Sequence, residues 1–305
     1  MSDLTFSNNL IKMYTNKNVN ILSAGAKLAL DYINGKIGLI YDDYDYKGNL
    51  VQEWKKYKLE EIYINSPRKK TINMDDKIFF HNIMKDSVYT PESYLSKEEI
   101  DDKESLYFVK NRGGTGGKGV NIYNYEELLK ININNCVIQK NISNPDLHMN
   151  KRYKIRQMIL IYNKNIYVYK KSFFTASGVI YNSGNSIDKL KDTHVINQNL
   201  GHSIEITNKL DNFDLIFANI LLAVRDFKKF YNKEIDSICE NEYSLLGLDF
   251  IVDDNKNVQI IEINHRSNYR HPETVSFDCD ISLFKDTIIL LKNNNEKDTN
   301  FENIN

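Results

Sequence analysis

The chain has 305 residues, of which 41% are hydrophobic, so it can bury a sizeable core and wholesale disorder is excluded. Its 40 lysine and arginine residues balance 41 acidic residues, and this near-neutral charge lacks the basic footprint of a general nucleic-acid-binding protein. Cys136, Cys239 and Cys279 lie far apart, which favours a reducing compartment over a disulfide framework. We see neither a signal sequence nor an apolar run long enough to span a bilayer, so we expect a cytoplasmic protein.

The N-terminal part is predicted to be a small α/β domain over residues 1–64, followed by a polar linker over 65–76. The domain is expected because short apolar runs alternate with turn signals. An amphipathic helix is predicted next, over 76–86. Its apolar face comprises Ile78, Phe79, Ile83 and Met84. Ser96 followed by two glutamates is then typical of a short helix with a side-chain N-cap.

The middle of the chain is predicted to alternate short strands with one helix, and the C-terminal half to hold a larger sheet closed by helices. The strands are expected over 106–110, 120–123, 137–139, 155–162, 166–170, 245–252 and 258–264. The helices are expected over 124–131, with Asn124 as its cap, 211–231 and 281–292. The asparagine-rich tail, 293–305, is expected to be disordered.

The glycine-rich loop at 111–119 has the formal pattern GxGxxG from Gly114. A dinucleotide-binding fold requires a helix directly after such a loop, but β-like residues follow instead. A Walker A loop is also excluded, because Gly119 rather than Ser or Thr follows Lys118. The remaining interpretation is a flap between antiparallel strands, whose backbone N–H groups cover a triphosphate while Lys110 meets an inner phosphate. The alternative is a merely mobile hairpin.

The predicted C-terminal hairpin carries three oxygen-bearing side chains. A four-residue loop would pair Asp253 with Val258. Asp249 then lies opposite Glu262, and Asn264 shares their face. Opposed carboxylates are destabilising unless a cation lies between them, and hard oxygen ligands suit Mg²⁺. The alternative is that these carboxylates face solvent or pair with lysine or arginine.

The order of these features resembles the tubulin tyrosine ligase-like family of ATP-grasp ligases. Four further segments are similar to that family: CVIQKNI at 136–142, NKRYKIRQMILI at 150–161, YVYKKSFF at 167–174 and HVIN at 194–197. The resemblance implies an α+β ATP-grasp fold, in which two α+β subdomains grip ATP beside the small N-terminal α/β domain. It divides the chain into the N-terminal domain (1–64), a central subdomain (65–136), a C-terminal subdomain (137–292) and a disordered tail (293–305).

The resemblance also implies roles for individual residues. ATP would be bound by Lys77, Lys110, the flap residues Gly114, Thr115, Gly116, Gly117, Lys118 and Gly119, the adenine hinge Gln139, Lys140, Asn141 and Ile142, and by Arg152 and Lys154. Magnesium would be held by Asp249, Glu262 and Asn264. The catalytic residues would be Arg156, which faces the acyl phosphate, His194, and Asn197 near the γ-phosphate. Taken alone, His194 is more often a hydrogen-bonded structural histidine.

Three positions depart from the family pattern. An acidic nucleotide contact is replaced by Lys154, an arginine that reads the amino acid is replaced by Thr175, and the threonine of the family's His-Leu-Thr-Asn signature is Ile196. One hypothesis is that Lys154 compensates for the lost arginine. The other is that the site takes a different amino acid or amine, or none.

The resemblance therefore leads us to expect an ATP-dependent ligase that joins an amino acid to a carboxylate through an acyl phosphate, with ATP and Mg²⁺ as cofactors. The expected partners are a protein or peptide carboxylate, such as a tubulin tail, and a free amino acid, with no nucleic acid and no membrane. The alternatives are an ATP-grasp ligase for a small peptide or metabolite, and a nucleotide-binding pseudoenzyme that acts as a scaffold.

Overall fold

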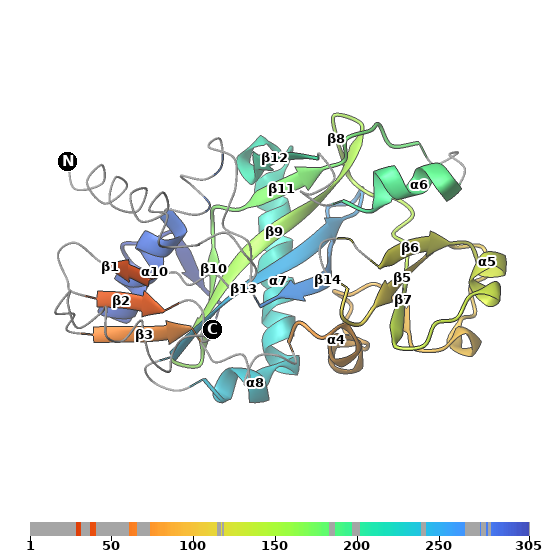
Figure 1. Cartoon of the computed structure of the whole chain (residues 1–305). Helices are drawn as coiled ribbons and strands as arrows, with labels where there is room; N and C mark the ends of the chain where they lie inside the picture. Colours follow the sequence, from red (N-terminus) through yellow and green to blue (C-terminus); the bar gives the residue numbers. More distant parts are fainter. Residues whose placement is uncertain are drawn as a thin grey trace.

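The computed structural model describes residues 29–31, 37–40, 61–65, 74–114, 117, 119–182, 187–196, 202–238, 242–265, 275, 279 and 282–304. Over these residues the chain is a mixed α and β structure built on two largely antiparallel sheets, one of eleven strands and one of four (Figure 1). Most of the predicted linker lies outside the described residues, and so does Cys239. Within the described part, no helix is both long enough and apolar enough to cross a membrane.

The four-stranded sheet contains the glycine-rich hairpin. Its order is β4-β7-β5-β6, with antiparallel neighbours throughout. Its elements are β4 Ser93–Tyr94, β5 Tyr107–Asn111, β6 Val120–Tyr123, β7 Cys136–Lys140 and the adjoining helix α5 Tyr125–Lys130. Helix α5 begins where predicted, because the Asn124 side chain accepts a hydrogen bond from the Glu127 N–H. Leu128 of α5 packs with Tyr107 in the core beside this sheet.

The eleven-stranded sheet has the main order β1-β2-β3-β13-β9-β10-β15, with β14 beside β13, β8 and β11 beside β9, and β12 beside β11. Its strands are β1 Ala29–Asp31, β2 Ile37–Ile40, β3 Glu61–Asn65, β8 Leu147–His148, β9 Lys151–Tyr162, β10 Asn165–Tyr169, β11 Phe173–Ala176, β12 Ser203–Ile206, β13 Glu242–Val252, β14 Val258–Asn264 and β15 Phe301–Asn303. The two longest strands, β9 and β13, pair at its centre.

One face of the large sheet is covered by the longest helix, α7, which crosses behind the sheet in Figure 1. The helices are α4 Lys77–Met84, α6 Ile187–His194, α7 Phe213–Phe230, α8 Asn232–Asp236 and α10 Ser282–Asn293, with the 3₁₀ turns η2 Lys97–Glu99 and η4 Thr207–Lys209. Ile220 and Phe227 of α7 share one buried core with Ile155 of β9 and Leu248 and Phe250 of β13. Because side chains alternate along a strand, the residues next to these on β9 and β13 point to the opposite face, toward the small sheet.

The two short helices before the glycine-rich hairpin differ in how they begin. Asp76 caps α4, since its side chain accepts hydrogen bonds from the N–H groups of Ile78 and Phe79. The buried face of α4 is centred on Phe80 and Met84, so Ile78 lies at its margin rather than within it. The prediction of a capped helix after Ser96 is wrong in detail, because Ser96 precedes a 3₁₀ turn and makes no side-chain cap.

The C-terminal tail is ordered, contrary to the prediction of disorder. Strand β15 pairs antiparallel with β10, and Phe301 and Ile304 are each only 2% exposed. Phe301 packs against the rings of Tyr167 and Tyr169. The polar composition of this tail therefore conceals two apolar anchors whose burial offsets the entropy cost of ordering it.

The predicted subdomain boundaries also shift. Strand β7 pairs with β5 and β4, so the small sheet extends to Lys140 and the predicted boundary at 136/137 would cut through one of its strands. At the N-terminal side, β3 pairs in parallel with β13, so the described strands of the predicted N-terminal domain continue the large sheet. A separate domain over 1–64 stays a prediction.

A β-bulge sets the register of the C-terminal hairpin. Val252, not Asp253, pairs with Val258, so the loop is one residue longer than predicted. The register then shifts at the bulge, where Ile261 is the extra residue, and Asp249 lies opposite Glu262 as predicted. The bulge thereby turns Glu262 away from the core face on which Val258 lies.

Candidate functional site

A cleft of about 130 Å³ between the two sheets brings together most of the predicted site residues. These are Lys77, Lys110, Gly114, Gly117, Gln139, Lys140, Ile142, Arg152, Lys154, Arg156, His194, Glu262 and Asn264. Asn141 lies beside the cleft, and Asp249 lies beneath its wall. Thr115, Gly116, Lys118 and Asn197 lie outside the described residues, so their roles stay predictions.

Strand β9 supplies three cations to one wall of the cleft. Arg152, Lys154 and Arg156 occupy alternate positions and therefore share a face, whereas Tyr153 and Ile155 between them lie in the core. The amphipathic pattern of β9 thus separates a charged cleft face from an apolar core face within one strand.

The central carboxylate beside this wall, Asp249, is fully buried and held by two cations. Lys154 Nζ lies 2.8 Å from Asp249 Oδ2, while Arg156 donates through Nε to Oδ1 and through Nη2 to Oδ2, the latter at 3.1 Å. Burial acts to raise the pKa of Asp249, but Arg156 and Lys154 outweigh burial and hold that pKa below its usual value. The carboxylate is therefore ionised, and this pairing is the alternative that the sequence left open.

The neighbouring carboxylate, Glu262, is paired with a different cation. Lys77 Nζ lies 3.1 Å from Glu262 Oε1 and donates a hydrogen bond to the carbonyl oxygen of Gly114 at 2.7 Å. One ammonium group thus joins α4, the glycine-rich flap and β14. The Glu262 side chain keeps 29% of its surface exposed, so it opens to the cleft as Asp249 does not.

The fit of these residues to magnesium is uneven. Carboxylate and amide oxygens are the ligands that Mg²⁺ prefers, and Glu262 and Asn264 present such atoms at the cleft wall. Both oxygens of Asp249 instead accept hydrogen bonds from Lys154 and Arg156. Among the described residues, no group of three or more His, Cys, Asp and Glu side chains is arranged to hold a metal ion. The geometry therefore fits an ion held by Glu262 and Asn264 together with a ligand.

Lys110 lies on the opposite wall, where β5 carries it into the interior. Its ammonium donates to Gln139 Oε1 at 2.5 Å and to the carbonyl oxygen of Ile261, the bulge residue, at 3.3 Å. Burial lowers the pKa of Lys110 to about 8, with Glu262 opposing the shift and Lys77 adding to it. No carboxylate of the described residues lies at ion-pair distance from this ammonium, so it is free to meet an anion.

A second buried cation, Arg152, supports the predicted hinge. Its guanidinium donates to Asn141 Oδ1 at 2.9 Å and to the Ile142 carbonyl at 3.5 Å, and it lies 5.9 Å from the ring of Tyr181. Its Nε has no hydrogen-bond partner, and the residue is only 2% exposed. Burial lowers the pKa of Arg152 to about 10. Within the described part of the chain, this cation too lacks a carboxylate partner.

The flap returns to β6 through a glycine that the backbone requires. Gly119 has a φ of +75°, and a Cβ there would lie 2.9 Å from Nδ2 of Asn111. The two residues also face each other across the hairpin, since the Asn111 N–H donates to the Gly119 carbonyl. Any side chain at this position would be strained, so the flap keeps its narrow base.

His194 closes one end of the cleft as a neutral ring. Its Nδ1 lies 3.0 Å from the Leu190 carbonyl and 2.6 Å from Thr193 Oγ1, and its ring packs between Phe108 and Tyr181. Burial and then the nearby Arg152 lower its pKa to about 3. His194 is therefore uncharged at neutral pH, which favours a packing role over a cationic one.

Two of the three departures from the family pattern, Lys154 and Thr175, meet on one sheet face. Thr175 pairs directly with Lys154 across β11 and β9, so the lost arginine and the gained lysine are neighbours. Thr175 is only 2% exposed, and the ammonium of Lys154 binds Asp249. Lys154 is thus adjacent to the position for which one hypothesis has it compensate, but its ammonium binds Asp249 on β13, on the side away from Thr175.

Sequence reasoning missed the apolar part of the cleft. Phe108, Val120, Ile251 and Ile261 line it beside the charged residues. A signal for Phe108 was present, because it lies two residues before Lys110 on one strand and so shares its face. Ile261 could not be found in this way, since it reaches the cleft only through the bulge.

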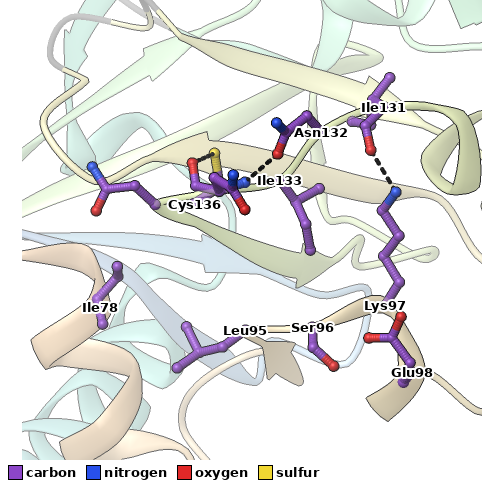
Figure 2. Close-up of a pocket in the computed structure, with 11 residues that line it drawn as sticks. Ile78, Leu95, Ser96, Lys97, Glu98, Ile131, Asn132, Ile133 and Cys136 are labelled. Atoms are coloured by element: carbon purple, nitrogen blue, oxygen red, sulfur yellow. Dashed lines mark hydrogen bonds between the residues drawn. The ribbon is translucent and has the colours of Figure 1, made fainter.

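A second hollow, of about 510 Å³, lies beside the small sheet (Figure 2). It is lined by residues of α4, by η2 and by the loop that leads into β7. Lys97 of this hollow donates hydrogen bonds to the backbone carbonyls of Leu129 and Ile131, and Figure 2 draws the bond to Ile131 as a dashed line. This hollow has no converging set of charged groups, so the cleft is the better candidate site despite its smaller volume.

Comparison with known proteins assigns the chain to a family. A search of curated proteins finds no match. The family model described as the tubulin-tyrosine ligase family matches residues 48–237, which is more than half of the chain and includes the flap, the hinge, β9 and α7. Members of this family are ATP-dependent ligases with an ATP-grasp-like fold, with which the antiparallel sheets described above are compatible. The chain belongs to the tubulin-tyrosine ligase family.

Proposed function

We propose that this ligase joins a free amino acid to a carboxylate of a protein or peptide, such as a tubulin tail, through an acyl phosphate. The observation that carries the proposal is the charge of the cleft. Six cations line it, namely Lys77, Lys110, Lys140, Arg152, Lys154 and Arg156, whereas Glu262 is the acidic residue among its described lining. Such an excess of positive charge suits a polyphosphate.

Two sets of residues in the cleft suit different parts of ATP. Lys110 and Arg152 are buried cations without carboxylate partners in the described chain, and a buried charge of this kind is stabilised by an arriving phosphate. The apolar side chains of Phe108, Val120 and Ile251 suit a planar base, next to the hinge that ends at Ile142.

The proposed reaction has two steps. An acceptor carboxylate attacks the γ-phosphate of ATP, which gives an acyl phosphate and ADP, and the amine then displaces phosphate and forms the amide bond. The protein's contribution is to position the reactants and to neutralise the developing charge, for which Arg156 and Lys154 are placed on the β9 wall. Magnesium, when bound by Glu262 and Asn264, would supply further charge neutralisation at the phosphates.

The test is a ligation assay without an assumed acceptor. The enzyme is incubated with ATP, Mg²⁺, mixed amino acids and host-cell protein that includes tubulin, and mass spectrometry locates any added amino acid. We expect an addition that requires ATP and is lost in Lys110→Met. Lys130→Met, at an exposed lysine at the end of α5, is the matched control and is expected to retain it. A wild-type rate in Lys110→Met would contradict the assignment of the cleft.

One observation favours a second candidate, the nucleotide-binding pseudoenzyme. Both oxygens of Asp249 are engaged by basic residues, so this carboxylate is less available than a catalytic metal ligand would be. A pseudoenzyme predicts ATP binding, seen as a raised melting temperature, without ATP turnover under any acceptor and amino-acid condition. Detectable ATP-dependent product would exclude it.

A further inference from the structure

The most unusual feature of the cleft is that Asp249 has its charge balanced before any ligand arrives. Lys154 and Arg156 hold its two oxygens, Asp249 is 0% exposed, and the two cationic side chains are only 14% and 16% exposed. Register enforces this arrangement, since β9 and β13 place Arg156 directly opposite Asp249. Lys154 lies two residues along the same strand and therefore on the same face.

The Lys154 side chain is also confined on its other side. Its cross-strand neighbour on β11 is the buried Thr175, and Phe173 lies opposite Arg156. Pulling Lys154 or Arg156 away from Asp249 would break one of two buried ion pairs, which is a costly change. A metal ion could bind Asp249 only by displacing at least one of these two cations.

The other two predicted ligands are not restricted in this way. The Glu262 side chain is 29% exposed, and its Oε1 pairs with Lys77, which also binds the flap carbonyl of Gly114. Asn264 donates its Nδ2 to the Gly247 carbonyl at 3.5 Å, which leaves its amide oxygen for a ligand. The hairpin therefore offers one accessible pair of oxygen ligands and one carboxylate that is already neutralised.

We propose that the Lys154 ammonium is the resident cation of Asp249, so that this chain binds its nucleotide with a single divalent ion, held by Glu262 and Asn264, instead of a pair of ions. The fixed charge of Lys154 would balance the negative charge of Asp249, in the place of a second divalent ion bound there. The inference rests on the proposed function, because it presumes that the cleft binds ATP.

The experiment counts divalent ions in the nucleotide complex. The full-length chain is saturated with a non-hydrolysable ATP analogue and titrated with Mn²⁺, and electron paramagnetic resonance measures free and bound Mn²⁺. We expect one bound ion per bound nucleotide in the wild type. Lys154→Asp, which replaces the cation by a carboxylate beside Asp249, is expected to double that number. Lys154→Arg keeps the charge and is expected to keep the wild-type number.

A matched control comes from an ion pair of the same length outside the cleft. Lys209 Nζ lies 2.8 Å from Glu205 Oε2, as Lys154 does from Asp249, but its side chain is 56% exposed. Lys209→Asp is therefore expected to leave the Mn²⁺ count unchanged. Circular dichroism and the melting temperature verify folding of each variant.

The outcomes are distinct. Two Mn²⁺ ions per nucleotide in the wild type, or an unchanged count in a folded Lys154→Asp, would overturn this inference and leave the proposed function standing. Absence of nucleotide binding in a folded wild type would overturn the proposed function and the inference with it. If Lys154→Asp fails to fold, the counts for the wild type and Lys154→Arg still decide.

Discussion

Lys110 is a buried lysine whose pKa lies at about 8, within reach of physiological conditions. Only the protonated form attracts a phosphate, and a bound phosphate raises the pKa of Lys110 again. We therefore expect nucleotide affinity to be nearly constant below neutral pH and to weaken above pH 8, by at most about tenfold per pH unit. Calorimetry at neutral and alkaline pH, in buffers of different ionisation enthalpy, measures both the affinity and the proton uptake on binding.

The control for this pH dependence is Lys110→Met. It removes the titrating group, so its binding should be weaker than that of the wild type and independent of pH over the same range. An equally steep pH dependence in Lys110→Met would show that another group controls binding.

Asp249 and Glu262 lie opposite each other on neighbouring strands, but we expect substitution of Asp249 to affect mainly stability and substitution of Glu262 to affect mainly turnover. Asp249→Asn leaves the Lys154–Arg156 pair without a counter-charge in the interior and is expected to lower the free energy of unfolding by about 3 kcal/mol. Glu262→Gln removes a partly exposed carboxylate and is expected to cost less than about 1 kcal/mol while abolishing turnover. Urea denaturation and ATP turnover, measured on both variants, check this. Equal losses of stability would contradict the difference in burial.

At the scale of elements, the tail strand is the clearest test of how the fold is held. Phe301→Ala should lower the free energy of unfolding by about 3 kcal/mol, because the ring is buried against Tyr167 and Tyr169. Glu302→Ala, the next residue and a partly exposed partner of Lys170, is the control and should change stability by less than about 0.5 kcal/mol. Denaturation of Phe301→Ala at the wild-type urea midpoint would mean that β15 contributes nothing.

Local patterns predicted most of the elements, and long-range contacts account for the errors. The Asn124 cap and the alternation along β9 are properties of a few consecutive residues, so the sequence was sufficient for them. The strand at Phe301 depends on β10, which lies far away in the sequence. At the bulge, β14 also contacts a distant loop, since the Ile260 N–H donates to the Tyr89 carbonyl at 2.7 Å. Rules for hairpin loops use only neighbouring residues and so cannot predict a contact with Tyr89.

The predictions for the candidate site also divide into those that the sequence supports and those that depend on long-range contacts. The convergence of Lys110, the flap and Glu262 was predicted from the family resemblance, and the structure brings them together. The ion pairs of Asp249 were present only as an open alternative, because they depend on the pairing of β9 with β13. The neutral state of His194 depends on burial beneath Phe108 and Tyr181, which no local pattern indicates.

At the scale of the whole molecule, the balanced net charge hides a local excess of cations in the cleft. Nucleotide binding should therefore be salt-dependent, although the chain as a whole is nearly neutral. We expect affinity for the ATP analogue to fall by roughly tenfold between low and high potassium chloride. Fluorescence titration with a labelled analogue measures this, and an affinity unaffected by salt would contradict an electrostatic role for the cleft.

The bulge at Ile261 makes the chemistry of the hairpin depend on the number of residues in β14 as well as on their identity. Exchange of Ile261 for another apolar residue keeps Glu262 in the cleft. Removal of the same residue would restore a regular ladder in which Glu262 follows Ile260 directly, so Glu262 and Asn264 would still face the cleft and Ile263 would stay in the apolar layer under α7. The deletion would instead remove the carbonyl oxygen to which the buried Lys110 ammonium donates at 3.3 Å, so a chain without the extra residue would keep its carboxylates and lose this contact of the lysine.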